Sequence, residues 1–145
     1  MKAGSCVFCK MVAGEIPVTR VYEDSEVLAF LDINPISDGH SLVIPKQHVE
    51  KLDESSSELL GCLGERLPRI ARAVIRAIQA DGYNVLCNNG SAAGQAVEHL
   101  HFHIIPRRQG DGVFDRWPAY KYEAGKMEEL ADKIRQNFEI RERSS

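Results

Sequence analysis

The stretch His-Leu-His-Phe-His-Ile-Ile-Pro at residues 99–106 decides the fold, because histidine alternates with an apolar residue three times before Pro106 ends the run. In a β-strand, successive side chains point to opposite faces, so residues i, i+2 and i+4 share one face. On a helix, residues two apart are rotated by about 200° and do not share a face. The pattern therefore predicts a strand with three imidazoles on one face and Leu100, Phe102 and Ile104 on the other.

Three roles are compatible with such a row of imidazoles. The apolar face can be buried, so the imidazole face is the one expected to look into a cleft, where a histidine could act as a nucleophile. The three rings could instead bind a metal ion, which a strand supplies readily. They could also be only a satisfied polar face of the strand. An expression tag is excluded because tags are contiguous and terminal.

Length and composition indicate an ordinary globular protein. The 145 residues fit one domain, residues 1–145, that buries about two-thirds of its unfolded surface. The net charge of −3 gives no general basic field for nucleic acid. There is no apolar run of about 18 residues and no signal peptide, so no membrane partner is expected and the cytoplasm is the default location.

Two of the four cysteines have the spacing of a metal site. Cys6 and Cys9 form a C-x-x-C pair, which lets two thiolates converge on one tetrahedral ion. A redox motif would need a preceding strand, and nothing strand-like precedes Cys6. Zinc would need two more ligands, for which histidines are the candidates. Cys62 and Cys87 stand singly among apolar residues and are expected to be core thiols.

The rest of the chain predicts an α+β domain. Alternation and turn residues place strands at 19–23, 27–31, 41–44 and 83–88, before the histidine strand. Ser55–Glu58 offers N-cap candidates for a long amphipathic helix that runs to about residue 80, with a kink or break at Pro68. An irregular segment at 109–123 precedes a second amphipathic helix at 128–138, and residues 141–145 are expected to fray. The small loop at 89–95 carries glycines that let backbone N–H groups approach an anion.

These features together resemble the histidine triad (HIT) nucleotide-binding superfamily. Residues 99–105 match its His-φ-His-φ-His-φ-φ signature, in which φ is apolar. Further matching segments are Phe8-Cys9-Lys10, Gly14-Glu15-Ile16-Pro17, residues 28–35, residues 39–48 (GHSLVIPKQH), Asn88-Asn89-Gly90 and Gly94-Gln95. The chain resembles in particular the purine-nucleoside phosphoramidase-like branch and its zinc-bearing bacterial members.

The resemblance implies an architecture. It implies an α+β fold with a five-stranded antiparallel sheet, a HIT core at about residues 5–108 and a C-terminal extension at 109–145. It also implies a homodimer joined through Tyr83–Asn88 and the long helix, which gives one ten-stranded sheet. The segment around Trp117 could reach the neighbouring chain's cleft, or its indole could pack on its own chain.

The resemblance also implies a reaction, the hydrolysis or transfer of a nucleoside monophosphate such as AMP from a phosphoramidate or a dinucleoside polyphosphate. The implied nucleophile is His101, and the implied neighbours of the phosphate are His103 and His40. A neutral imidazole suits the role, because its unperturbed pKa is about 6.5 and a covalent intermediate splits hydrolysis into two easier steps. The implied nucleotide-binding residues are Phe8, Met11, Phe30 and Ile33 at the base, Asp32 at the ribose, and Asn88, Gln95, Ala96, His101 and His103 at the phosphate.

Two further points depend on the resemblance. The zinc-bearing members hold a structural ion with the equivalents of Cys6, Cys9, His48 and His99, which implies one zinc per chain in a closed set with no position for water. Many relatives carry Ser or Thr at the position of Ala96, where a hydroxyl can serve the leaving group. Ala96 cannot donate, so slower expulsion of the leaving group is expected.

Three function classes stay open at this point. The first is a nucleotide hydrolase that uses His101, and the second is a nucleotide-binding regulatory or scaffold protein with little turnover. The third is a zinc hydrolase with the three histidines on the metal, for which Cys6 and Cys9 would be irrelevant to metal content. The sequence does not choose among purine bases, between phosphoramidate and dinucleoside polyphosphate, or identify the physiological substrate.

Overall fold

A computed structural model of the chain describes residues 3–115 and 118–144, with side chains up to residue 138. The chain forms two compact units, Met1–Val113 and Phe114–Ser145. The second unit contains one helix, α3 (Lys126–Ser144). None of the helices in the described ranges is long and apolar enough to cross a membrane. Trp117, for which two alternative placements are predicted, lies outside the described residues.

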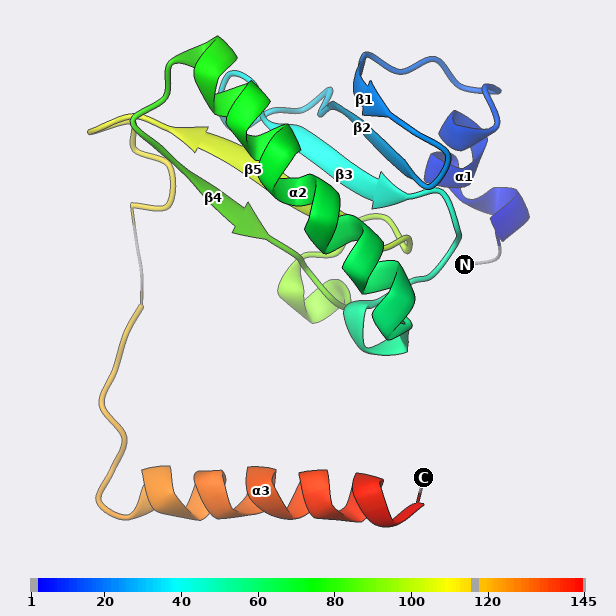
Figure 1. Cartoon of the computed structure of the whole chain (residues 1–145). Coiled ribbons are helices and arrows are strands. Elements are labelled where there is room, and N and C mark those ends of the chain that lie inside the picture. The colour runs from blue at the N-terminus through cyan, green and yellow to red at the C-terminus, as the bar shows by residue number, and fades with distance from the viewer. Residues whose placement is uncertain (1–2, 116–117, 145) are drawn as a thin grey trace. The chain divides into compact units, whose positions relative to one another are not determined.

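The first unit is built on a five-stranded antiparallel sheet (Figure 1). The strands are β1 (Arg20–Glu23), β2 (Val27–Leu31), β3 (Ser41–Pro45), β4 (Gly82–Leu86) and β5 (Phe102–Arg107), in the order β1-β2-β3-β5-β4. The helices of this unit are α1 (Val7–Val12) and α2 (Ser57–Ile78), with short 3₁₀ turns at Ala3–Ser5, Leu52–Glu54 and Ser91–Ala93. The predicted α+β fold with a five-stranded antiparallel sheet is confirmed.

The two faces of the sheet have separate cores, because alternate strand residues point in opposite directions. Helix α2 lies across one face (Figure 1). There the histidine stretch's Leu100 and Ile104 pack with Leu63 and Val74 from α2. On the other face, Phe8 from α1 packs with residues of β2 and β3. Since both faces are covered, four of the five residues of β2 and all of β3 are buried. The face opposite α2 is the one left for the imidazoles.

Helix α2 begins and ends as its sequence predicts, but it is not broken at Pro68. The Ser56 side chain caps the helix by accepting a hydrogen bond from the backbone N–H of Leu59. Pro68 lies inside one continuous helix, so of the predicted kink or break the break is wrong. An interior proline costs about 3 kcal/mol. Buried apolar side chains on both sides of it, such as Leu63 and Ile70, offset that cost by about 1.5–3 kcal/mol each.

The histidine strand is shorter than its sequence pattern predicts. β5 begins at Phe102, so His99 and His101 precede it and only His103 lies within it. The ladder to β3 stops at the pair Val43 and Phe102. If the ladder continued in the same register, Leu100 would face Pro45, which has no N–H to donate. The face alternation nevertheless persists, because the Leu100 N–H bonds to the carbonyl of Val49 at 2.7 Å and keeps this segment fixed.

Three smaller predictions are also corrected. β4 ends at Leu86, so Asn88 lies in the following loop. Helix α3 extends to Ser144, beyond the predicted range of 128–138, and ion pairs one turn apart such as Lys133–Glu129 support it. Cys62 is not a core thiol, since it is half-buried and donates a hydrogen bond to Glu26. Cys87 does pack against the α2-side core.

Candidate functional site

One cavity gathers most of the predicted nucleotide-binding residues. It has a volume of about 640 Å³, which is in the range of small-molecule sites. Eight of the ten predicted residues line it, namely Phe8, Met11, Phe30, Asp32, Ile33, Ala96, His101 and His103. The Ile33 side chain is 89% exposed, so its apolar surface is available for contact with a ligand. A second cavity of about 550 Å³ lies against α2, is mostly apolar and holds none of the histidines.

Several lining residues were not predicted from the sequence. They are Val7, Pro17, Val18, Thr19, Leu31, Asn34, Leu42, Gly94 and Val97. Strand parity could have identified Leu42, because its side chain points to the same face as that of Ile44. Val7 belongs to α1, which has only six residues and no amphipathic repeat long enough to indicate a helix. Val97 follows the glycine loop and carried no separate signal.

The hydrogen-bond partner of His101 fixes the position of its proton. Nδ1 of His101 lies 2.7 Å from the carbonyl oxygen of His99. A carbonyl only accepts, so Nδ1 carries the hydrogen and donates it, and Nε2 keeps a free lone pair. Burial lowers the pKa of His101, which keeps the ring neutral near pH 7. The Phe8 ring meets the imidazole edge-on with ring centres 5.2 Å apart and helps to orient it.

A chain of hydrogen bonds fixes the next two imidazoles in the same way. The backbone N–H of Ile36 donates to Nδ1 of His40 at 3.2 Å. Nε2 of His40 must therefore carry the hydrogen, which it donates to Nδ1 of His103 at 2.9 Å. His103 consequently carries its own hydrogen on Nε2. His40 is buried and is not among the residues that line the cavity. Its role is to hold the ring of His103 in place through their hydrogen bond.

Asp32, His40 and His103 also lie close enough together to suggest a metal site. The hydrogen-bond chain disagrees with that interpretation, because Nε2 of His40 is protonated and has no lone pair for an ion. The two ring nitrogens are 2.9 Å apart, whereas two nitrogens on one tetrahedral zinc would be about 3.3–3.4 Å apart. We interpret this group as a chain of hydrogen bonds beside the cavity that determines the tautomers of its histidines.

The environment of His103 predicts an unusual titration. Burial, followed by His101 and His40, lowers the pKa of His103 to about 4, although Asp32 acts in the opposite direction. Between pH 6.5 and about 4 the unfolded chain then binds the proton and the folded chain does not. The contribution of His103 to the free energy of unfolding is thus fully present above pH 6.5 and is lost as the pH falls toward 4. Histidine ¹⁵N NMR should find His103 neutral at pH 5.5, and titration near 6.5 would contradict the prediction.

The loop between β4 and the histidines holds Asn88 and Gln95, the two predicted nucleotide-binding residues that are not among those lining the cavity. Gly90 and Gly94 have φ values of +88° and +89°, which favour glycine. A Cβ on Gly94 would lie 3.6 Å from the side-chain nitrogen of Asn88, so the Asn88 amide sits beside this lining residue. Gln95 is buried and its amide bonds to main-chain groups of Gly90 and Glu50.

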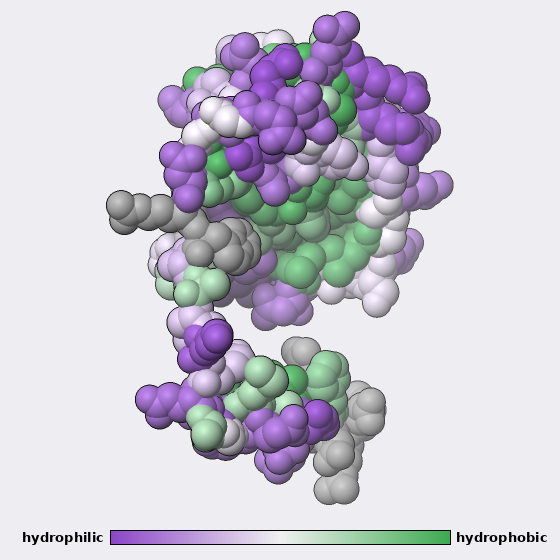
Figure 2. All heavy atoms as spheres, turned by 90° about the vertical axis from the view of Figure 1, so that its left-hand side faces the viewer, coloured by the Kyte–Doolittle hydropathy of each residue, from purple (hydrophilic) through white to green (hydrophobic). Residues whose placement is uncertain are grey.

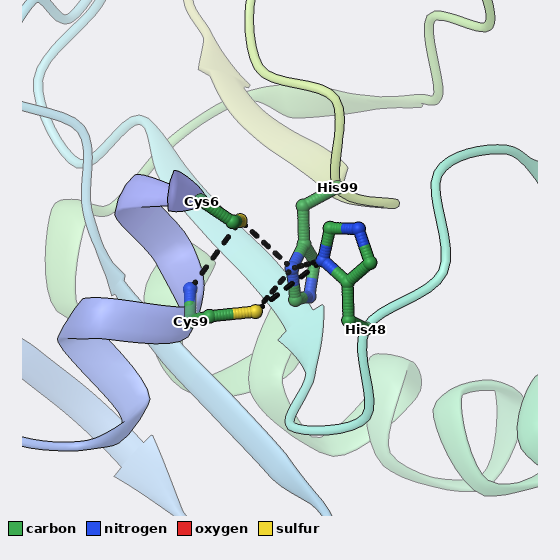
Figure 3. A group of neighbouring side chains, drawn as sticks. All are labelled: Cys6, Cys9, His48 and His99. Atoms are coloured by element: carbon green, nitrogen blue, oxygen red, sulfur yellow. Dashed lines mark hydrogen bonds between the residues drawn. The ribbon is translucent and has the colours of Figure 1, made fainter. Parts of the chain in front are cut away.

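The two predicted cysteines and two predicted histidines form one cluster (Figure 3). Cys6 and Cys9 come from α1 and its N-cap, His48 from the loop after β3, and His99 from the segment before β5. The four ligand atoms all lie within 4.8 Å of one another. Nδ1 of His99 lies 3.3 Å from Sγ of Cys6 and 3.6 Å from Sγ of Cys9. Nδ1 of His48 lies 3.3 Å from Sγ of Cys9 and 3.2 Å from Nδ1 of His99.

These residues fit a tetrahedral zinc ion. Zn–S and Zn–N bonds of about 2.3 and 2.0–2.1 Å would place nitrogen–nitrogen and nitrogen–sulfur pairs about 3.3–3.6 Å apart, close to the observed distances. Nε2 of His99 donates to the carbonyl of Pro45 at 2.8 Å, which leaves the Nδ1 lone pair for a metal. Nε2 of His48 is buried without a partner among the described residues, so the ring's polar contacts are all on the Nδ1 side.

The surroundings of the Cys9 thiol affect its protonation. Burial, and then the neighbouring Cys6, raises the pKa of the Cys9 thiol to about 11, so without a cation this sulfur stays protonated. A bound divalent ion would favour the thiolate, because metal binding displaces the proton. The cluster could therefore hold a metal ion.

Comparisons with known proteins agree with the geometry. A family model described as HIT domain matches residues 13–110. The adenosine 5'-monophosphoramidase of Schizosaccharomyces pombe is 45% identical over 131 residues, which cover 90% of this chain and 96% of that protein. An adenylylsulfatase of Arabidopsis thaliana is 46% identical over 106 residues, which cover 73% of this chain and 54% of that protein.

Solved structures share the fold, and one of them is described as zinc-bound. A Streptococcus mutans protein matches with a TM-score of 0.88 and 43% identity, covering 92% of this chain and 85% of that chain. A zinc-bound histidine triad family protein from Mycobacterium smegmatis matches with a TM-score of 0.72 and 44% identity, covering 81% of this chain and 86% of that chain.

Proposed function

The chain belongs to the HIT domain family, and we propose that it is a hydrolase that releases a nucleoside monophosphate from a phosphoramidate through a nucleotidyl-histidine intermediate. The observation that carries this proposal is the free Nε2 lone pair of His101 in the cavity. Phe8, Met11, Phe30 and Ile33 would hold the base, preferably a purine such as adenine, and the Asp32 carboxylate would accept hydrogen bonds from ribose hydroxyls.

The proposed reaction has two displacements. Nε2 of His101 attacks the α-phosphorus, the P–N bond to the leaving amine breaks, and the electron pair leaves with the amine nitrogen. A water molecule then attacks the phosphorus, the P–Nε2 bond breaks, and AMP leaves while the imidazole regains its lone pair. The Nε2–H of His103, the Asn88 amide and the backbone N–H of Ala96 would stabilise the charge that develops on the phosphate oxygens.

Ala96 bears on the choice of leaving group. Its side chain has no hydroxyl, so the departing amine would take its proton from water while His103 donates a hydrogen bond. Sulfate is a stable anion and departs without protonation, so the lack of a hydroxyl donor also favours a second candidate activity on an adenylyl sulfate. An adenylylsulfatase among the relatives supports testing it.

We propose that the cluster of Cys6, Cys9, His48 and His99 holds one structural zinc per chain. When bound, this ion would join three separate chain segments. All four positions of a tetrahedral ion would be filled by side chains, so the role is structural. The zinc-bound relative supports the same assignment.

We also propose a homodimer with a ten-stranded sheet, joined at β4 and through α2. β4 is an edge strand whose side chains are mostly exposed, including Tyr83 at 50% and Val85 at 45%. Figure 2 views the side on which β4 lies in Figure 1 and shows a broad apolar area on the first unit. The other edge, β1, is protected by the charges of Arg20 and Glu23. An unprotected apolar edge favours pairing with a second copy.

The dimer prediction has a matched control, because Val85 on β4 and Val21 on β1 are both 45% exposed. Light scattering of the full chain should give about twice 16.2 kDa. Val85→Lys would place like charges near the two-fold axis and should shift the protein toward monomer, whereas Val21→Lys should leave the mass unchanged. A wild-type monomer, or an equal response of the two variants, would contradict the interface.

The proposed activity is tested by offering purified protein three substrates in parallel. Adenosine 5'-phosphoramidate, adenosine 5'-phosphosulfate and a diadenosine polyphosphate differ only in the group that leaves the α-phosphorus. AMP release from the phosphoramidate supports the proposal, and preferred release from the phosphosulfate supports the second candidate. AMP binding without turnover of any substrate would instead favour a nucleotide-binding regulatory protein. The cytoplasmic location and the absence of nucleic-acid and membrane partners stay predictions.

A further inference from the structure

Gln95 uses its side-chain amide to join two segments of main chain. Its Oε1 accepts a hydrogen bond from the Gly90 N–H at 2.7 Å, and its Nε2 donates to the carbonyl of Glu50 at 2.7 Å. The side chain is only 9% exposed. A buried amide with both ends bonded holds its neighbours in place and is costly to remove.

Two further hydrogen bonds join the same segments. The backbone N–H of Leu52 donates to the Asn89 side chain at 2.8 Å, and the N–H of Leu100 donates to the carbonyl of Val49 at 2.7 Å. Residues 48–52 therefore run beside the loop at 88–100 and are bonded to it at three places. Gln95 is the middle connection, and it lies between the cavity-lining residues Gly94 and Ala96.

The residues directly after Gln95 line the cavity beside His101. The N–H groups of Ala93, Gly94 and Gln95 all bond to carbonyls within the loop. In the part of the chain that the structure describes, those of Ala96 and Val97 have no partner. Both residues directly follow Gln95 and line the cavity together with His101, so they offer main-chain donors at the end of the loop that Gln95 holds.

We propose that Gln95 is a positioning residue, which fixes the Ala96 and Val97 N–H groups so that they bind the phosphate of the nucleotide. This inference rests on the proposed function, because it assigns those donors to the phosphate. The resemblance implies that Gln95 itself donates to the phosphate together with adjoining backbone N–H groups, and the present inference differs in that the Gln95 amide does not contact the ligand. Here the amide acts through Gly90 and Glu50, and the ligand is held by the main chain.

Two variants separate these roles. Gln95→Met keeps the length of the side chain and removes both hydrogen bonds, whereas Gln95→Glu keeps the acceptor for Gly90 and loses the donor to Glu50. Gln136→Met, on the exposed surface of α3, is the matched control. Hydrogen–deuterium exchange of the ligand-free protein should be about tenfold faster at the Gly90, Ala93 and Gly94 amides in Gln95→Met. It should be intermediate in Gln95→Glu and unchanged in α2.

Binding of AMP and of adenosine then shows what the loop holds. Adenosine has the base and ribose but no phosphate, so Gln95→Met should weaken AMP binding about tenfold and change adenosine binding less than twofold. Weaker AMP binding without faster loop exchange would mean that Gln95 contacts the phosphate directly, and would overturn the proposal. Equal losses for AMP and adenosine, or unchanged AMP binding, would overturn it too. Failure of the wild-type protein to bind AMP would instead refute the proposed function.

Discussion

Replacement of His101 by alanine should lower the rate of AMP release from adenosine 5'-phosphoramidate by about a thousandfold or more. Alanine has no lone pair to attack phosphorus, so the first displacement would depend on water. The variant should still bind AMP within a few-fold of wild type, because the base slot and the loop donors are unchanged. The effect should therefore fall on kcat and leave binding nearly intact.

The measurement pairs single-turnover kinetics with calorimetric titration of AMP. His103→Ala is the matched comparison, because it removes a neighbouring imidazole that donates to the phosphate and does not attack it. That variant should lose about a hundredfold, at the lower end of what is expected for one charge-stabilising donor. Rapid quenching of the wild-type reaction should trap a nucleotidyl group on His101. Near-normal turnover by His101→Ala would exclude the covalent mechanism.

The sequence predicted the faces of the histidine stretch better than its hydrogen bonds. Alternation of His and apolar residues correctly separated Leu100 and Ile104 from the imidazoles, because the direction of side chains is a local property of extended backbone. The start of β5 at Phe102 depends on the missing N–H of Pro45, far away in sequence. A pattern within residues 99–106 carries no information about that partner.

The same distinction applies to the helices. The start of α2 was predictable, because the Ser56 cap and the apolar stripe are local signals. The continuation of α2 through Pro68 was not predictable, because packing against the sheet decides whether the loss of the proline's backbone hydrogen bond is tolerated. Helix α1 has only six residues and is held by the packing of Phe8. It is too short for a helical repeat of apolar residues to predict it from the sequence.

In the candidate site, residue types were predictable and proton positions were not. Eight of the ten predicted nucleotide-binding residues line the cavity because the family resemblance carries their positions. The tautomers of His40 and His103 follow from the backbone N–H of Ile36, a contact that no spacing reveals. The hydrogen bonding of Gln95 could not be predicted for the same reason, because its partner Glu50 is 45 residues away in the sequence.

Replacement of both Cys6 and Cys9 by serine should abolish zinc binding and lower the thermal midpoint by about 10 °C or more. Zinc at about a thousand times its dissociation constant stabilises a folded protein by about 4 kcal/mol. For a chain of this size, each kcal/mol shifts the midpoint by about 3 °C. The ion would link α1, the loop after β3 and the segment before β5 at the four side chains of Figure 3, and the variant removes that link.

Cys62→Ser/Cys87→Ser is the matched control for that variant, because it removes the same number of thiols away from the cluster. Elemental analysis should find one zinc per chain in wild type and in the control, and none in Cys6→Ser/Cys9→Ser. A zinc hydrolase with the three histidines on the metal predicts the reverse, with zinc retained in the cysteine variant and lost in His101→Ala. The donated hydrogen on Nδ1 of His101 leaves Nε2 as the only possible ligand atom of that ring. Since the four ligand atoms of the cluster lie within 4.8 Å of one another and could by themselves surround one ion, we expect His101→Ala to keep its zinc and lose its chemistry.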